Sequence, residues 1–448
     1  MAGSVFDSAL FAGLFPTGEV GRLFTDSAAI RAMLLVEGAL ARAQGAQGII
    51  PADSAEAIHR ASMEVQIEPG SLAGATGQNG VAVPALVAAF RSEMQAPEHA
   101  QYVHWGATSQ DIIDTGLMLR LRQSLALIEG DLNAVITALG TLAATHAELP
   151  MAARTYGQHA TPTSFGAVIA EWGRPLVGLA GELPALRENC LLVSLSGAAG
   201  TASALGPQVA QTRAALAKAL GLSDPGAGWH NDRTAILRLG DWMVRVTLGL
   251  GKLGEDLCGL TQTGIGEVTL GGVGGSSTMP QKQNPVAPSV LVALARQGTG
   301  LNGVLQGSGM HRYQRDGAAW FSEWMCLPQI VLGAASAVRI AGDLCAGLRP
   351  DPDAMAAALS DGLGMIHAEA LSFALAGNMR RPDAQAAVKA LCQEAQETGV
   401  SLVDLVRRDW PDIDGALDGA LFDPARQMGT APDDARAFAD LAKAFVTN

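Results

Sequence analysis

The chain has 448 residues, of which 48% are hydrophobic and 16% are charged, and its 43 acidic and 30 basic residues give a formal charge of −13. About 25% charged residues is usual for a globular domain, so this apolar composition excludes disorder as the main state. The negative charge and the lack of a long Lys/Arg run argue against nucleic acid as the main partner. The same charge at first disfavours an anionic substrate, although local cations decide that question.

The sequence predicts neither a membrane segment nor secretion. A spanning helix needs about 20 mostly apolar residues in a row, and charges such as Glu37, Arg42 and Arg339 interrupt the apolar stretches. Asp7 and the lack of a basic region at the N-terminus argue against a secretory signal. Five widely spaced cysteines without a CxxC pair are typical of a cytoplasmic protein that has neither disulfides nor a zinc site.

Most of the chain is predicted to be helical, because Ala and Leu dominate and apolar residues recur at three- and four-residue spacing. The clearest amphipathic segments span residues 30–47, 117–149 and 241–263. The longer of these exceed the mean helix length of about 11–12 residues, and long helices with long connections suggest a bundle. We therefore expect an all-α fold.

Segments rich in Gly, Pro and Ser separate these helices. They span residues 69–80, 220–234, 271–285 and 349–353. We predict an N-terminal helical domain over residues 1–110, a central long-helix bundle over 111–348 and a C-terminal helical cap over 349–448. Within the central domain, residues 271–285 are expected to form a mobile catalytic loop.

The first polar segment precedes the helix expected near residue 117. His104, Thr108, Ser109 and Asp111 crowd one turn there. Either hydroxyl could simply cap the helix, and His104 could be a structural histidine with satisfied hydrogen bonds. The density of small polar groups beside a His and a Trp favours a binding site.

The second polar segment contains Arg154, Thr155, Gln158 and His159, and it ends at Pro162. A polar turn followed by a helix that starts at the proline would explain the same residues. Taken alone, this segment does not distinguish a site from a turn.

The third segment, residues 271–285, combines glycines with Ser276, Ser277, Lys282 and Asn284. Glycine gives a loop mobility, and a mobile loop with these groups near a helix start suits a lid that closes on an anion. An ordinary linker is the alternative, but linkers rarely carry Met-Pro-x-Lys-x-Asn-Pro after paired serines.

Together and in this order, the three segments resemble the fumarase/aspartase superfamily. The strongest mark is GSSTMPQKQN at 275–284, and HWGATSQDIIDT, RDGAAWFSEWMCLP and HAEALSFALAGNMRRPDAQAAV extend the resemblance along nearly the whole chain. Within the superfamily, the chain is most similar to the bacterial 3-carboxy-cis,cis-muconate cycloisomerase branch. This resemblance implies a fumarase/aspartase-like long-helix bundle core with smaller N- and C-terminal helical domains. It also implies a homotetramer whose active sites are each built from three subunits, with no cofactor and no metal.

The resemblance also implies roles for individual residues. The expected catalytic residues are Ser276, Lys282 and His159, with Ser276 transferring the proton at carbon. Closure against Lys282 and helix N-terminal amides is the physical way to lower the pKa of that serine. Arg315 is expected to clamp a substrate carboxylate because its planar fork suits bidentate binding, although an ion pair with Asp316 or a neighbouring helix would also explain it. The expected substrate contacts are His104, Thr108, Ser109, Arg154, Tyr156, Ser277, Asn284 and Arg315.

Three positions depart from the superfamily pattern. Tyr156 stands where members that eliminate an amine or water usually have His, and a phenol with a pKa of about 10 is a poor proton relay at neutral pH. Lactonization tolerates this loss, because the nucleophile is the substrate's own ionised carboxylate. Trp324 follows Glu323 where adenylosuccinate lyases tend to have Arg, which argues against a nucleotide phosphate. Gln283 replaces a frequent Arg or Lys and could tune the site toward a variant acid.

The leading hypothesis is a cytoplasmic cycloisomerase that lactonizes 3-carboxy-cis,cis-muconate, a small tricarboxylate, to 4-carboxymuconolactone in protocatechuate breakdown. Fixed cations and N–H donors would stabilise an enediolate-like intermediate, one proton would be delivered to carbon, and intramolecular attack removes most of the entropic cost. A substrate with a sulfonate in place of the 3-carboxylate is conceivable. The alternative is a fumarate-releasing lyase of the adenylosuccinate type, and a third class is a catalytically silent structural relative.

Overall fold

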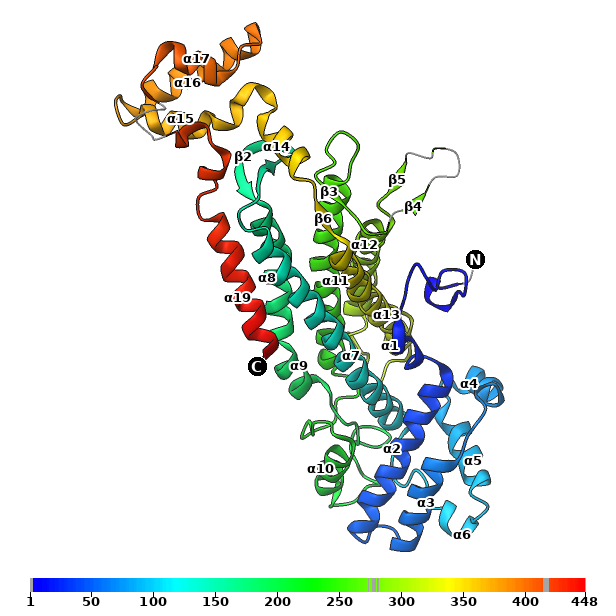
Figure 1. The fold of residues 1–448 in the computed structure, drawn as a ribbon. Helices are drawn as coiled ribbons and strands as arrows, with labels where there is room; N and C mark the ends of the chain where they lie inside the picture. The colour runs from blue at the N-terminus through cyan, green and yellow to red at the C-terminus, as the bar shows by residue number, and fades with distance from the viewer. Residues whose placement is uncertain (1–2, 273, 276–278, 280–281, 414–418, 448) are drawn as a thin grey trace. The chain divides into compact units, whose positions relative to one another are not determined.

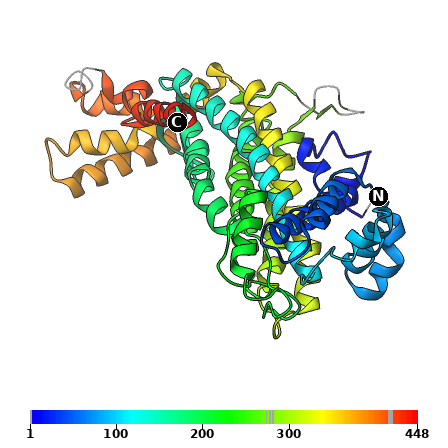
Figure 2. The same ribbon diagram turned by 90° about the horizontal axis from the view of Figure 1, so that it is seen from below.

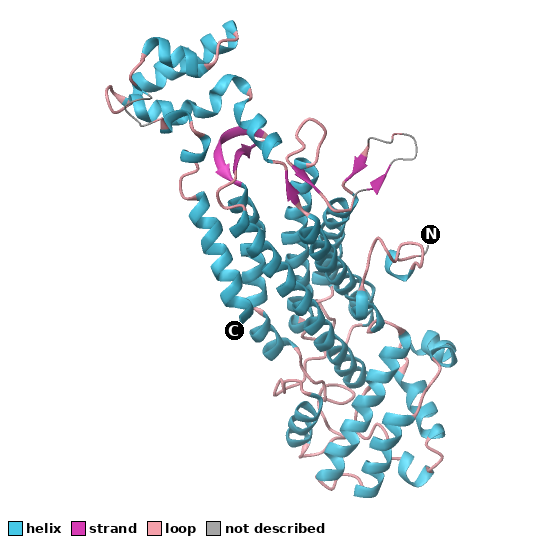
Figure 3. Cartoon of the chain, viewed as in Figure 1, coloured by secondary structure: helices cyan, strands magenta, loops and turns pink. Residues whose placement is uncertain are grey.

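A computed structural model describes residues 3–272, 274–275, 279, 282–413 and 419–447. In this part of the chain, helices predominate and the strands form three two-stranded sheets (Figures 1 and 3). The prediction of an all-α fold is confirmed. The segments 30–47 and 241–263 lie largely within the helices Asp26–Ala46 and Thr234–Leu260.

The chain divides into two compact units. The first contains Met1–Asp131, Leu179–Leu248 and Ala293–Ile340, and the second contains Leu132–Gly178, Gly249–Val292 and Ala341–Asn448. Four long helices contribute to both units: α7 (Ser109–Thr145), α11 (Thr234–Leu260), α12 (Val286–Gly307) and α13 (Gly317–Gly347). Because this division cuts across the long helices, it does not test the three domains predicted from the sequence.

Short helices complete the first unit. They are α1 (Gly18–Arg22), α2 (Asp26–Ala46), α3 (Ala52–Glu64), α4 (Ala73–Asn79), α5 (Val83–Glu93), α6 (Pro97–Ala100), α9 (Leu183–Cys190) and α10 (Val209–Leu220), with 3-10 turns at Val5–Asp7 and Pro69–Leu72. The Thr25 hydroxyl accepts from the Ala28 amide at 3.2 Å and so caps α2. Leu34, Ile58 and Phe90 are buried in one core, where each large apolar side chain contributes about 1.5–3 kcal/mol.

The second unit combines helices with all the described strands. The helices are α8 (Phe165–Gly181), α14 (Pro352–Ser360), α15 (Ala368–Leu375), α16 (Arg381–Thr398), α17 (Leu402–Asp409) and α19 (Ala431–Thr447), with 3-10 turns at Gly362–His367, Ala420–Phe422 and Pro424–Arg426. The strand pairs are β1 (Pro150–Thr155) with β2 (Gln158–Ser164), β3 (Val268–Thr269) with β6 (Arg349–Pro350), and β4 (Gly274–Gly275) with β5 (Gln283–Asn284). Residues of α15, α16 and α17 share a core of their own.

Two of the long helices, α7 and α13, are long and apolar enough to cross a membrane by length and composition alone. The most apolar window of α13 is 72% buried inside the protein, as expected for a core helix, whereas that of α7 is 39% buried. Core helices pass the same test, so this is weak evidence for a membrane segment.

Candidate active site

The described residues of the predicted catalytic loop include the paired strands β4 and β5 in the second unit. Gly274 pairs with Asn284 and Gly275 pairs with Gln283, and the Lys282 amide donates to the Met279 carbonyl at 3.0 Å. The side chain of Lys282 is exposed, and α12 begins two residues after Asn284. The predicted Ser276 and Ser277 lie outside the described residues.

The second polar segment is a β-hairpin, whereas the sequence predicted no strands there. β1 and β2 pair antiparallel, with Arg154 opposite His159. Tyr156 and Gly157 form the turn with positive φ of 51° and 72°, which matches the twist of a two-residue hairpin loop. The side chains of Tyr156 and His159 are both exposed.

Arg154 is engaged in a buried ion pair. Its two terminal nitrogens donate to the Glu267 carboxylate at 2.7 and 2.8 Å, and Glu267 is fully buried. This bidentate pair ties β1 to the segment before β3, beside a cavity of about 440 Å³ that Arg154 and Lys252 help to line. In one chain, the fork of Arg154 therefore already holds a carboxylate.

In the first unit, Thr108 and Ser109 stand at the start of α7. The Thr108 amide donates to Asp111 Oδ2 at 3.1 Å, while neither hydroxyl makes a hydrogen bond with any described residue. The geometry thus gives no support to a capping role for these hydroxyls and leaves them available to a ligand.

Asp111 organises the loops around this helix start. Its carboxylate accepts from the Ser194 hydroxyl, from the Ser196 and Gly197 amides at 2.9 and 3.0 Å, and from His230 Nε2 at 2.8 Å. Burial opposes ionisation of Asp111, but the hydrogen bonds from His230 and the backbone outweigh it and lower its pKa. The buried carboxylate therefore fixes the orientation of the His230 ring.

His230 is the main residue that the sequence analysis missed. It lies in the segment 220–234, which was expected to be only a turn-rich insertion, 119 residues from Asp111. It lines a cavity of about 190 Å³ with Asn231 and Gln314. The WHND sequence offered a signal, since a His beside polar residues in a loop is a candidate ligand contact.

His104 is held in a similar way. It has a positive φ of 65°, and its Nδ1 lies 2.7 Å from Oε1 of the buried Glu37. Burial lowers the pKa of His104, but the hydrogen bond and the charge of Glu37 outweigh burial and raise it overall. The second oxygen of Glu37 is buried without a hydrogen-bond partner in the described chain.

Arg315 joins this cluster through Gln110. Its Nε donates to Gln110 Oε1 at 2.7 Å and its Nη2 donates to the Ala198 carbonyl at 3.3 Å. Gln110 in turn donates to the His230 carbonyl at 2.9 Å. Nη1 of Arg315 makes no hydrogen bond with a described residue, so one edge of the guanidinium is available to a carboxylate.

A buried network of ion pairs adjoins this cluster. Arg233 donates to Asp114 at 2.7 and 3.0 Å and to Glu323 at 2.8 and 2.7 Å, and all three side chains are fully buried. Trp324, next to Glu323, packs its ring against Trp320 at 4.7 Å between centroids. Arg233, Asp114 and Glu323 therefore satisfy one another's charges inside the protein.

The structure brings together one set of the predicted residues and separates another. His104, Thr108 and Arg315 each interact with Gln110 or Asp111 in the first unit, and Ser109 is the first residue of α7 beside them. In the second unit, the β1–β2 and β4–β5 hairpins lie apart from one another (Figures 1 and 2). One chain therefore keeps these two hairpins separate (Figure 1).

A family model described as a lyase matches residues 16–300. The chain belongs to this lyase family. The family match and the relatives below confirm the resemblance stated from the sequence.

Relatives of this lyase cover nearly its whole length. A protein from Pseudomonas aeruginosa named 3-carboxy-cis,cis-muconate cycloisomerase is 36% identical over 430 residues, which is 94% of each chain. A nitrosuccinate lyase from Streptomyces davaonensis is 35% identical over 446 residues, 96% of this lyase and 94% of its relative. The crystal structure of the 3-carboxy-cis,cis-muconate lactonizing enzyme from Pseudomonas putida matches with a TM-score of 0.90 and 33% identity, covering 98% of this chain and 100% of the other.

Proposed function

We propose that this lyase is a cycloisomerase that lactonizes 3-carboxy-cis,cis-muconate to 4-carboxymuconolactone in protocatechuate breakdown. The observation that carries the proposal is the near-complete match to the lactonizing enzyme, with a TM-score of 0.90 over 98% of the chain. The exposed Tyr156 supports it, because a release of amine or water would need a better acid at that position.

In the proposed reaction, one substrate carboxylate oxygen forms a bond to an alkene carbon. The electron pair of the double bond moves toward the adjacent carbon and its carboxylate, giving an enediolate-like intermediate. A proton is then added to that carbon, so the product is an isomer of the substrate. Ser276 is the proposed proton donor, with Lys282 and Asn284 stabilising the developing charge.

The cluster in the first unit is the proposed carboxylate site. The free edge of Arg315, the unpaired hydroxyls of Thr108 and Ser109, and the raised pKa of His104 all favour an anion there. His230, oriented by Asp111, would complete the polar wall. His159 is proposed to act in proton transfer, and Arg154, Tyr156 and Ser277 are proposed to contact the substrate.

A complete site is proposed to form only in a homotetramer. The two hairpins of one chain lie apart, so neighbouring copies would supply the missing segments (Figure 1). The incomplete burial of the most apolar window of α7, at 39%, supports helix packing between copies. We propose a cytoplasmic location, as expected for an enzyme with five unpaired cysteines.

The direct test is to incubate the purified protein separately with 3-carboxymuconate, adenylosuccinate and nitrosuccinate and to follow ultraviolet absorbance. We expect turnover of 3-carboxymuconate, with at least a hundredfold lower kcat/KM for the other two acids. A parallel assay with 3-sulfomuconate measures the preference for the 3-substituent. Turnover of adenylosuccinate alone or nitrosuccinate alone would overturn the proposal.

A further inference from the structure

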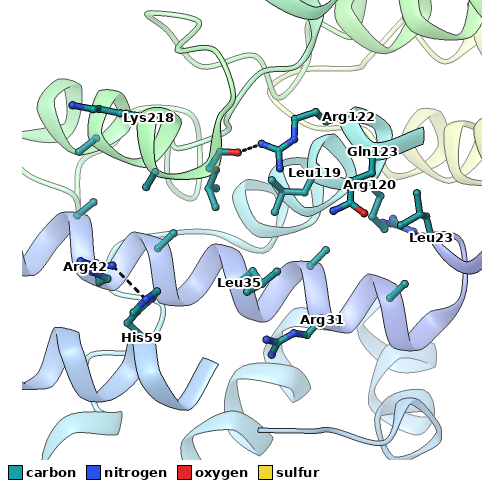
Figure 4. Close-up of a pocket in the computed structure, with 17 residues that line it drawn as sticks. Leu23, Arg31, Leu35, Arg42, His59, Leu119, Arg120, Arg122, Gln123 and Lys218 are labelled. Carbon is teal, nitrogen blue, oxygen red and sulfur yellow. Dashed lines mark hydrogen bonds between the residues drawn. The ribbon is translucent and has the colours of Figure 1, made fainter. Parts of the chain in front are cut away.

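The first unit contains a groove that shares no residue with the proposed active site. Its volume is about 750 Å³, which is the size of a pocket for a small organic ligand. The walls come from α2, α7 and α10, with His59 of α3 at one side (Figure 4).

One face of α2 forms the floor of the groove. The lining residues recur at the three- and four-residue spacing of a helix, and four of them are alanines. They are Ala28, Arg31, Ala32, Leu35, Ala39, Arg42 and Ala43. At about 1.5 Å per residue, the span from Ala28 to Ala43 is about 22 Å. The groove is therefore elongated, and its middle is apolar.

Cations border this apolar floor. Five of the seventeen lining residues are basic and none is Asp or Glu, although acidic residues outnumber basic ones in the whole chain. The five are Arg31, Arg42, Arg120, Arg122 and Lys218. Arg42 and Lys218 lie toward one end of the groove and Arg120 and Arg122 toward the other (Figure 4). The groove thus has positive charge at both ends.

Two of these cationic side chains are held in place by backbone carbonyls rather than by carboxylates. Arg31 donates to the Ser62 carbonyl at 2.6 Å, and Arg122 donates to the Leu220 carbonyl. A carbonyl orients a guanidinium without cancelling its charge. Lys218 has no acidic partner within 4 Å in the described part of the chain.

Two buried nitrogens on the lining side chains have no hydrogen-bond partner among the described residues. They are Nε of Arg120 and Nδ1 of His59. Arg42 Nη1 lies 3.4 Å from His59 Nε2, and because a guanidinium can only donate, Nδ1 of His59 carries the ring proton. Unpaired buried donors are costly.

Acidic groups outside the groove compensate only part of its charge. Glu56 lies 3.5 Å from Arg42, and Asp26 interacts with Arg120. Burial lowers the pKa of Arg120 to about 10, although the charge of Asp26 opposes this shift.

We propose that this groove binds a small elongated molecule with an apolar middle and an acid group at each end, of the class of the long-chain dicarboxylates. The elongated apolar floor would contact the hydrocarbon part of the ligand, and the cations at the two ends would bind its carboxylates. A segment of a second copy of this protein is the competing occupant.

Calorimetric titration of the full chain tests this directly, with dodecanedioate, dodecanoate and 1,12-dodecanediol as ligands of equal length. We expect one dodecanedioate per chain, with about a tenfold loss of affinity for each carboxylate removed. Equal affinity for the diol, or no binding of any of the three, would overturn the proposal. Because binding is read directly, the result does not depend on the lactonizing activity.

Variants locate the binding. Lys218→Glu should weaken dodecanedioate at least tenfold, and the matched exposed variant Lys389→Glu should not. Leu35→Trp, which fills the groove, should abolish binding, with circular dichroism confirming that the helices are retained. Lys282→Ala should leave the affinity unchanged, and loss of binding in that variant would place the ligand in the active site instead. Light scattering tests whether a second copy occupies the groove instead. If both Lys218→Glu and Leu35→Trp dissociate the assembly, another copy fills the groove and the proposal is overturned.

Discussion

Replacement of Asp111 by Asn tests whether this buried carboxylate holds the active-site loops together. Two of its donors, the Thr108 and Gly197 amides, share Oδ2, while His230 and the other donors share Oδ1. An amide –NH2 in place of Oδ2 would leave at least two buried donors without an acceptor. At about 1–3 kcal/mol each, the expected loss in the free energy of unfolding is about 2–6 kcal/mol.

Urea denaturation of the wild type and Asp111→Asn measures this loss. Asp383→Asn is the matched control, because Asp383 pairs with Arg380 at 2.8 Å on the surface and should cost less than about 1 kcal/mol. The pKa of Asp111 is lowered in the folded state, so its contribution is present above the ordinary carboxyl pKa of about 4. The advantage of the wild type over Asp111→Asn should therefore shrink as the pH falls below that value.

The same variant should also reduce turnover, because His230 and the start of α7 would lose their fixed orientation. A stability loss below about 1 kcal/mol with unchanged kcat would refute the reasoning, since neither the loops nor His230 would then depend on the carboxylate. A stability loss with unchanged kcat would restrict Asp111 to a structural role.

Three further predictions follow from the same contacts. Because Glu37 raises the pKa of His104, the stability that this pair contributes is present below about pH 6.5 and declines as the pH rises. The urea midpoint of Glu37→Gln should therefore differ more from that of the wild type at pH 6 than at pH 8. Arg154→Met should lower the free energy of unfolding in urea by about 3–5 kcal/mol, because Glu267 stays buried and unpaired. The double variant with Glu267→Met should recover much of that loss. Equal losses in the single and the double variant would contradict this account of the ion pair. Tyr156→Phe should keep kcat within about threefold, whereas a hundredfold drop would reveal a proton relay through the phenol.

The helices could be predicted because their signals are local. The apolar spacing over residues 30–47 located α2 to within a few residues, and the start of the helix depends on Thr25, one position before it. The β1–β2 hairpin could not be predicted from its polar sequence. Its strands have six and seven residues, and its register depends on the positive φ of Tyr156 and Gly157 rather than on an alternating pattern.

The candidate site could be predicted only in part, because only some of its residues are close together in the sequence. The crowding of Thr108 and Ser109 is visible in the sequence because both residues belong to one turn. The partners that orient a site are distant: His230 reaches Asp111 across 119 residues, and Glu267 reaches Arg154 across 113. No periodicity or spacing encodes such pairs, because each joins a loop residue to a distant helix or strand, and the two are brought together only in the folded chain.

The formal charge of −13 does not conflict with a tricarboxylate substrate, because charge acts locally in this protein. Charges more than about 8 Å apart in physiological salt are largely screened, so the acidic surface contributes little at the site. At hydrogen-bond distance, binding of an anion depends on which cations are not already paired with a carboxylate. Arg233 and Arg154 are bound to buried carboxylates, whereas Arg315 keeps a free edge. The same reasoning applies to the groove along α2, where five cations without a lining acid make a second anionic ligand compatible with an acidic chain.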